Sequence, residues 1–387
     1  MEPLPTFTLE EFFAEWEFRA RYHLTASDAQ TCTVGELLEI AGAGALEELL
    51  ALPLGYLPTW GSDALREAIA ATYTATGPED VLTFCGAQEA MFWVLQELLG
   101  PGDHAVVTVP NYQSMESVPL ATGAGVSGIP LWRGEGAELR WALDVDRIAS
   151  AITERTRVVA VNLPNNPTGF VPDRQTWADL VAVCERRGVH LFADEVYRGV
   201  ETDPAATLPA AVDLSELGIS LDVTSKSLGL PGLRVGWVAC RDRGLLARLE
   251  KRKHWTSISG AAPSELLATY AVRHAGELRS RVRAVIAANR PLFDAFFAAH
   301  ADLFDWQAPD GGCVAFPRYR GADGVEAFCA ELLRERGVLL LPGSVYASRL
   351  LPVPADRFRI GIGRRDPGPA LAETAAFLAG RRVRVGS

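Results

Sequence analysis

One segment of the sequence, residues 224–237, combines hydroxyl groups, an amine and a guanidinium: it reads Thr-Ser-Lys-Ser-Leu-Gly-Leu-Pro-Gly-Leu-Arg-Val-Gly-Trp. Its lysine, Lys226, is one of only three in the chain, with Lys251 and Lys253. A lysine amine can lose its proton and attack a carbonyl carbon, whereas an arginine cannot. Lys251 and Lys253 belong to a short basic run that is typical of a solvated helix end. Lys226 is therefore the candidate for covalent chemistry, and Arg234 is the candidate for binding an anion beside it.

Three other places carry polar groups with two possible explanations each. Asp194 follows the apolar run Val-His-Leu-Phe-Ala, so it is either a structural helix cap or the anion that holds a protonated ring nitrogen. Asn166 belongs to a Pro-Asn-Asn-Pro turn that could also point an amide into a cleft. Residues 86–88 come between a predicted strand and a predicted helix, where backbone N–H groups can hold a phosphate. Together with Lys226 and Arg234, these groups meet the needs of a pyridoxal phosphate site.

The elements that must position these residues follow an alternating pattern. Short apolar runs predict strands at 81–85, 105–109, 158–163, 189–193, 219–223 and 234–239. Amphipathic stretches between them predict helices, among them 86–99 and 177–187. This alternation predicts an α/β fold with a mainly parallel central sheet and helices on both faces. Ligands of such sheets bind beyond the carboxyl ends of the strands, which is where Asp194, Asn166 and Lys226 lie.

The length of 387 residues allows two or three domains. We expect an N-terminal arm that joins a small domain (1–45), a large cofactor-binding domain (46–284) and a C-terminal small α/β domain (285–387). The chain begins with a predicted helix over 9–22, rich in Trp and Phe. Both ends of the chain could pair in the small domain.

Composition argues against several classes of protein. The net charge of −11 argues against a nucleic-acid or anionic-membrane surface, and no apolar run approaches the roughly 20 residues that span a bilayer. The acidic start of the chain does not look like a secretory signal, so we expect a cytoplasmic protein with free thiols. The six cysteines form no CxxC pair and the six histidines are isolated, so no metal site is expected. A GxGxxG pattern at 123–128 precedes a predicted strand rather than a helix, which disfavours dinucleotide binding.

The order of these motifs, from about Tyr56 to Arg359, resembles the fold-type-I pyridoxal phosphate (PLP) enzymes, specifically the class I/II aminotransferases. The resemblance implies that Lys226 is the Schiff-base lysine and moves the proton between the substrate and the cofactor. It implies that Asp194 pairs with the pyridinium nitrogen, that Tyr197 and Asn166 hydrogen-bond the ring hydroxylate, and that Tyr112 stacks on the ring.

The same resemblance implies the groups that bind the cofactor phosphate, which are Gly86, Ala87, Gln88, Ser225 and Arg234. Tyr56 matches the tyrosine that reaches the phosphate of the partner subunit, so a homodimer is implied. Arg359 matches the arginine that clamps the substrate α-carboxylate, with Asn166 beside it. Val223 departs from the pattern, because the family often has a phosphate-binding serine there; Thr224 or Ser225 would replace that contact. No clear second arginine is present for a side-chain carboxylate of the substrate.

Residues 20–29, leading to Thr-Val-Gly-Glu-Leu, and residues 253–265 resemble a narrower branch, the capreomycidine-synthase-like proteins. We therefore carry two predictions. The first is an aminotransferase that moves the amino group of an α-amino acid to a 2-oxo acid. The second is elimination and cyclisation, or oxidation, of an arginine-derived amino acid in specialised metabolism. A non-catalytic regulator built on this fold is disfavoured, because the lysine, aspartate and arginine are intact.

Overall fold

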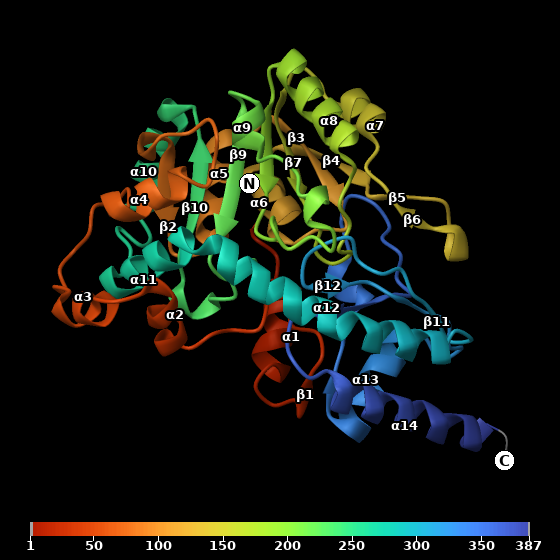
Figure 1. Ribbon diagram of the computed structural model, residues 1–387. Coiled ribbons are helices and arrows are strands. Elements are labelled where there is room, and N and C mark those ends of the chain that lie inside the picture. Colours follow the sequence, from red (N-terminus) through yellow and green to blue (C-terminus); the bar gives the residue numbers. More distant parts are fainter. Residues whose placement is uncertain (1–2, 386–387) are drawn as a thin grey trace.

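The computed structural model describes residues 3–385 and places a seven-stranded sheet at the centre of the larger part of the molecule (Figure 1). Its strands, in spatial order, are β2 (Val81–Phe84), β10 (Gly236–Cys240), β9 (Gly218–Val223), β8 (His190–Asp194), β7 (Thr156–Asn162), β3 (His104–Val109) and β4 (Gly125–Pro130). Strand β10 is antiparallel to β2 and to β9, and the other neighbours are parallel. The predicted α/β fold with a mainly parallel sheet is confirmed.

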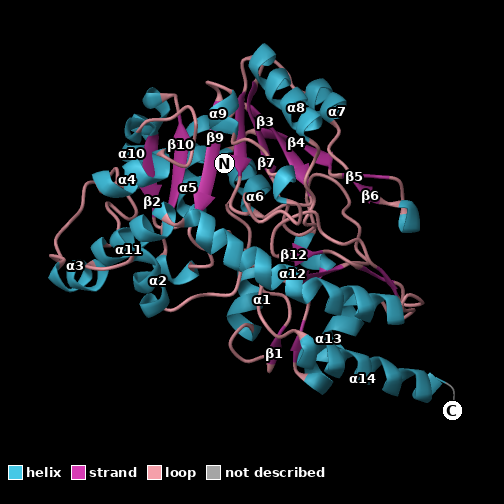
Figure 2. Ribbon diagram, in the orientation of Figure 1, coloured by secondary structure: helices cyan, strands magenta, loops and turns pink. Residues whose placement is uncertain are grey.

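Helices cover both faces of this sheet. Successive side chains of a strand point to opposite faces, so alternate residues pack into different hydrophobic cores. On β3, Ala105 and Val107 pack in one core with α5 and α10, whereas Val106 packs in another core with α7 and α8. The helices around the sheet are α4 (Asp63–Ala70), α5 (Ala87–Leu98), α6 (Ser114–Thr122), α7 (Val145–Ala151), α8 (Arg174–Arg187), α9 (Ala211–Leu214), α10 (Arg243–Lys253) and α11 (Ala262–Arg273). Figure 2 shows these helices flanking the strands. Both strand faces are apolar for that reason.

Segments from the N-terminal and C-terminal regions of the chain pack together outside the seven-stranded sheet, in a second part of the molecule. Strand β1 (Tyr22–His23) pairs in parallel with β14 (Val338–Leu339), which follows α13 (Val325–Arg336). The long helix α12 (Ala275–Ala299) crosses from the sheet region towards α14 (Gly368–Val385), as Figure 1 shows. The remaining elements are α1 (Thr8–Trp16), α2 (Val34–Ala41), α3 (Ala45–Ala51), β5 (Trp132–Arg133), β6 (Arg140–Trp141), β11 (Phe304–Asp305), β12 (Val314–Ala315), β13 (Arg318–Tyr319), β15 (Leu341–Pro342) and β16 (Phe358–Gly361).

Three local expectations need correction. The first helix ends at Trp16 instead of residue 22, because the chain then turns into β1. The strand expected from residue 234 begins at Gly236, because Arg234 adopts a left-handed conformation with φ 53°. Lys253 is not solvated: it is fully buried, and its amine donates a hydrogen bond to the carbonyl oxygen of Thr59. No helix within residues 3–385 is long and apolar enough to cross a membrane.

Candidate active site

A cavity of about 400 Å³ opens at the carboxyl ends of β8 and β9. Nine of the twelve predicted site residues line it: Ala87, Gln88, Tyr112, Asn166, Asp194, Tyr197, Ser225, Lys226 and Arg234. Gly86 adjoins this group through the backbone, whereas Tyr56 and Arg359 do not line the cavity. The fold thus brings together groups that lie up to 147 positions apart, from Ala87 to Arg234. A cavity of this size suits a small-molecule ligand.

Lys226 lies at the centre of the cavity wall, on the loop that follows β9. Its Nζ donates a hydrogen bond to Ser27 Oγ at 2.8 Å, and the Tyr197 hydroxyl donates to the carbonyl oxygen of the same serine at 2.7 Å. Burial lowers the pKa of the Lys226 amine; Asp28 opposes this effect and Arg359 adds to it. A lowered pKa increases the neutral fraction of the amine, which is the nucleophilic form.

Asp194 is the last residue of β8 and is buried. Its Oδ1 accepts one long hydrogen bond, from the backbone N–H of Val196 at 3.3 Å. Burial raises the pKa of the Asp194 carboxyl from 3.8 to about 7, with the backbone bond acting in the opposite direction. No helix begins directly after Asp194 in the described chain, so the helix-cap explanation fails. A carboxyl group in this state fits a cationic partner in the cavity, such as a protonated ring nitrogen.

The start of α5 and the guanidinium of Arg234 form the end of the cavity that can bind an anion. Gly86 precedes α5 with φ 88°, and a Cβ built there would lie 2.4 Å from Arg234 Nη2. Only glycine therefore allows this close approach. The first turn of α5 has no side-chain cap, and Ala87 and Gln88 line the cavity. Exposed helix N–H groups beside an arginine fit a phosphate.

Val223 occupies the position where the family often has a phosphate-binding serine, and Thr224 and Ser225 were the two predicted replacements. Thr224 is fully buried, and its hydroxyl is directed to the carbonyl oxygens of Leu230 and Val235 at 3.3 and 3.1 Å. Ser225 lines the cavity instead, with its Oγ 3.4 Å from Arg234 Nη1. Of the two predicted replacements, Ser225 lines the cavity and Thr224 does not.

Arg359 on β16 lies behind the cavity and orients Asn166. Its Nη1 donates to Asn166 Oδ1 at 3.2 Å and to the Tyr346 hydroxyl at 2.7 Å, while Tyr346 also donates to Asn166 Oδ1. Two donors on Oδ1 leave the Nδ2 donor of Asn166 for the cavity. The ring of Phe13, which lines the cavity, lies 5.4 Å from the Arg359 guanidinium, and Arg359 Nε has no hydrogen-bond partner among the described residues.

Helix α1 forms a wall that sequence reasoning did not predict. Its Glu10 accepts a hydrogen bond from the Tyr112 hydroxyl at 2.8 Å, and Phe13 also lines the cavity. Ser27 and Asp28 line it from the loop after β1. The resemblance of residues 20–29 to capreomycidine-synthase-like proteins marked this region as special, but nothing in its residue pattern indicated a contact with Lys226.

Two predicted regions lie on the surface, away from this cavity. Tyr56 is 92% exposed, close in sequence to the exposed Leu54. Trp255, in the segment 253–265, is 85% exposed and does not line the cavity. These side chains can contribute to a site only by contact with another molecule.

The state of Asp194 predicts how pH affects the cofactor-free protein. A carboxyl whose pKa rises on folding favours the folded state below its ordinary pKa of 3.8, and this contribution is lost as the pH rises through about 7. Asp194→Asn removes that titration. Urea unfolding at pH 5 and pH 8 should show the variant gaining on the wild type at pH 8, by on the order of 1–4 kcal/mol. An equal difference at both pH values would contradict the prediction; Glu195 is present in both proteins and cancels.

Comparison with known proteins gives consistent results. A sequence model described as "Aminotransferase class I and II" matches residues 53–367. Capreomycidine synthase of Streptomyces vinaceus is 32% identical over 97% of this chain and 94% of its own, and arginine–pyruvate transaminase of Pseudomonas aeruginosa is 30% identical over 82% and 80%. Among solved structures, a PLP-dependent aminotransferase from Streptococcus suis superimposes with a TM-score of 0.89 at 28% identity, covering 98% of both chains. A PLP-dependent cyclase, OrfR, gives 0.87 at 28% identity over the same shares.

The donor set of the cavity fits the cofactor that these proteins use. It offers an amine for the aldehyde, a carboxylate for the ring nitrogen, an aromatic ring and a phosphate subsite. The chain therefore belongs to the class I and II aminotransferase family, and its cofactor is pyridoxal 5′-phosphate.

Proposed function

We propose that this protein is an aminotransferase that takes the amino group from an α-amino acid and passes it to a 2-oxo acid. The observation that carries the proposal is the convergence of Lys226, Asp194 and Arg234 on one cavity. The cofactor, when bound, withdraws electrons from the substrate Cα and so weakens its bonds. Lys226 holds the cofactor and then, as a free amine, moves the proton from the substrate Cα to C4′ of the cofactor.

The other residues bind and orient. Asp194 would keep the ring nitrogen protonated, and the Asn166 Nδ2 would donate to the ring hydroxylate. The Tyr197 hydroxyl, which donates to the Ser27 carbonyl oxygen here, would have to leave that oxygen to donate to the ring hydroxylate as well. Tyr112 covers the ring face. Arg359 does not line the cavity itself, and we propose that it binds the α-carboxylate of the substrate through the edge of its guanidinium that carries the unpartnered Nε. The phosphate is held by Ser225, Arg234 and the backbone of residues 86–88.

The cavity also supports a substrate with a positively charged side chain. Besides Asp194, three carboxylates line it, from Glu10, Glu17 and Asp28. Asp28 is paired with Arg364 at 2.9 and 3.0 Å, and Glu10 accepts the bond from Tyr112. Glu17 lies 3.7 Å from His23, whose pKa burial lowers to about 4, so the imidazole is neutral near pH 7. Glu17 is thus the carboxylate available to a cationic group, and two relatives have names that refer to arginine or its derivative capreomycidine.

A test of this preference uses Glu17→Gln. The variant should raise KM for L-arginine about 10- to 100-fold, because a charged hydrogen bond contributes about 1.5–3 kcal/mol. KM for L-leucine should stay the same. The control is Glu15→Gln, which removes an exposed carboxylate from the last turn of α1, two residues before Glu17. Equal KM changes for both amino acids would show that Glu17 does not read the side chain.

Elimination and cyclisation of an arginine-derived amino acid is the second candidate function. The match to capreomycidine synthase covers 97% of this chain, whereas the family model begins at residue 53. The cavity residues Ser27 and Asp28 lie before that boundary, and Ser27 contacts the reactive amine directly. The Ser27 hydroxyl beside Lys226 gives this site a polar group close to the substrate bonds that would break in an elimination.

One experiment separates the two functions. The purified PLP-bound enzyme is mixed with L-arginine, a hydroxylated arginine, L-ornithine and L-leucine, with and without pyruvate, and products are identified by mass spectrometry. Transamination should convert one equivalent of cofactor to pyridoxamine phosphate and need pyruvate for turnover. Cyclisation should proceed without pyruvate, with loss of water from the hydroxylated substrate and unchanged cofactor. No product from any amino acid would contradict both proposals.

We also propose a homodimer in which Tyr56 reaches the cofactor phosphate of the partner subunit. The proposal is supported by the exposure of Tyr56, Leu54 and Trp255, because large exposed apolar side chains mark interaction surfaces.

A further inference from the structure

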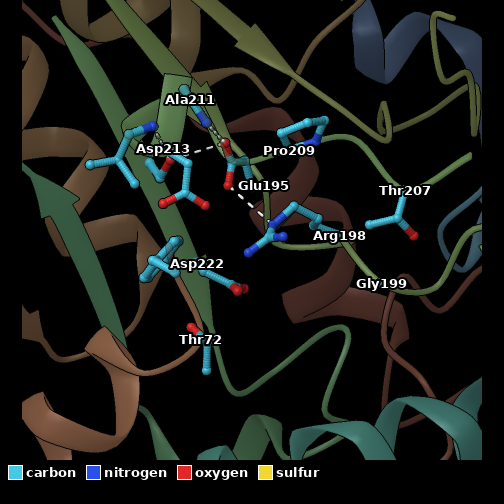
Figure 3. Close-up of polar contacts among 12 residues, drawn as sticks. Thr72, Glu195, Arg198, Gly199, Thr207, Pro209, Ala211, Asp213 and Asp222 are labelled. Carbon is cyan, nitrogen blue, oxygen red and sulfur yellow. Dashed lines mark hydrogen bonds and ion pairs between the residues drawn. The ribbon is translucent and has the colours of Figure 1, made fainter. Parts of the chain in front are cut away.

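Two loops carry the reactive groups of the cavity, and they touch each other directly. The backbone N–H of Ser227, next to Lys226, donates to the carbonyl oxygen of Val196 at 3.1 Å, next to Tyr197. Behind these loops lies a buried group of charges outside the cavity (Figure 3). There, Glu195 accepts hydrogen bonds from the backbone N–H of Ala211 at 2.7 Å and from the Ser220 hydroxyl at 3.0 Å.

Figure 3 shows Glu195 directed at Arg198, with Asp222 of the neighbouring strand below them. Arg198 Nε lies 3.4 Å from Glu195 Oε2. Asp222 is nearly inaccessible to solvent, and burial raises the pKa of its carboxyl, with Arg279 and Arg198 opposing that rise. Arg279 and Asp222 are 3.4 Å apart. Arg279 comes from helix α12, which is not part of the sheet or the loops.

The side chain of Arg279 contacts both loops. Its Nη2 faces Asp222 Oδ2 at 3.4 Å, and its Nε is 3.4 Å from Ser227 Oγ, one residue after Lys226. Its methylene carbons pack on Gly199, two residues after Tyr197. A Cβ at Gly199 would lie 2.6 Å from Arg279 Cδ, and the glycine has φ 90°. Any other residue there would be strained and would displace the arginine.

One turn further along α12, a second arginine reaches the same backbone: Arg283 Nη1 donates to the carbonyl oxygen of Gly199 at 2.6 Å. Residues three and four apart lie on one face of a helix, so this face of α12 holds the Tyr197 loop at two points. The remainder of α12 packs into the core of the second part of the molecule through Phe293 and Phe297. The helix therefore connects that core to the loops that carry the reactive groups.

We propose that Arg279 is a positioning residue for catalysis: it holds the Lys226 loop and the Tyr197 loop in register and ties both to α12. Arg279 does not line the cavity, so its effect passes through Ser227 and Gly199. This inference rests on the assigned cofactor and on the proposed role of Lys226. A displacement of about 1 Å in a positioned group can reduce a rate by about a hundredfold.

The test compares Arg279→Gln with Arg281→Gln. Arg281 lies on the same helix and is 47% exposed, and among residues 3–385 its ion pair is with the exposed Glu277, so its variant should behave as the wild type. Arg279→Gln should reduce the visible circular dichroism of the bound cofactor, which reports how the lysine-linked ring is held. It should also lower kcat by about 10- to 100-fold while KM changes less than about threefold. Arg279→Lys keeps the charge opposite Asp222 and should restore part of both.

The circular dichroism separates this inference from the proposed function. If the wild type turns over no amino acid, the visible signal still shows whether Arg279 positions the lysine-linked ring. A wild-type signal and a wild-type kcat in Arg279→Gln would overturn the inference. If Arg279→Gln does not fold, Ser227→Ala tests the same contact, because it keeps the guanidinium and removes its acceptor. An unchanged visible signal in Ser227→Ala would then overturn the inference.

Discussion

Lys226→Ala should abolish turnover, with a loss of at least about 10³-fold, while the protein still binds pyridoxal phosphate non-covalently. The loss combines two functions of one amine, the covalent hold on the cofactor and the proton transfer at Cα, and proton transfer alone is worth about 10²- to 10⁴-fold. The cofactor should remain bound because Asp194, Arg234 and the start of α5 do not depend on the lysine. The measurements are steady-state kinetics and absorbance after gel filtration.

Borohydride reduction followed by peptide mapping gives this prediction its control. In the wild type, the reduced cofactor should appear on the peptide that contains Lys226. Lys253 is the competing amine, since it is also buried and burial lowers its pKa, but it lies outside the cavity. Lys251→Ala, which removes an exposed amine, should leave labelling and turnover unchanged. Cofactor on Lys253, or normal turnover of Lys226→Ala, would contradict the assignment.

Arg359→Lys should raise KM for every amino acid substrate by about 30-fold or more. The guanidinium fork holds a carboxylate by two parallel hydrogen bonds, which a lysine cannot reproduce. Lysine keeps the positive charge but loses one of these two hydrogen bonds, and a hydrogen bond to a charged group contributes about 1.5–3 kcal/mol. The substitution also removes one of the two donors to Asn166 Oδ1, so kcat should fall as well. KM and kcat for two amino acids of different side chain are the measurements.

Arg357→Lys is the matched control, because Arg357 is a buried arginine two residues earlier, directly before β16. It donates to the carbonyl oxygen of Phe316 and lies 4.9 Å from the ring of Trp141, away from Asn166. Its variant should leave KM unchanged. If both variants raise KM equally, the effect belongs to the stability of the strand, and the α-carboxylate binds elsewhere.

The sheet could be predicted from the sequence because its strands are buried on both faces and are mostly apolar, as in Ala105–Val109, where Thr108 is the one polar residue. The cavity residues could be predicted because the carboxyl ends of parallel strands meet at one edge of the sheet, where ligands bind. The boundaries of the three predicted regions, the roles of the site residues and the homodimer remain predictions.

What the sequence could not predict depends on contacts between distant segments. Ser27 precedes Lys226 by 199 positions, and no local pattern links a serine to a lysine at that separation. Lys253 looked solvated because its neighbours are charged, yet one face of α10 packs on the segment that carries Thr59. Arg359 was expected in the cavity and lies behind it, because Tyr346 and Asn166 hold its guanidinium.

Helix α1 and the loop after β1 have a practical consequence for anyone who wishes to shorten this protein. A fragment trimmed to the span shared with the wider family, 53–367, would keep every motif residue, from Tyr56 to Arg359. It would discard Glu10, Glu17 and the serine that steadies the reactive amine, and with them one side of the reaction chamber. Such a fragment would keep the motif residues and lose the helix and the loop that close one side of the cavity.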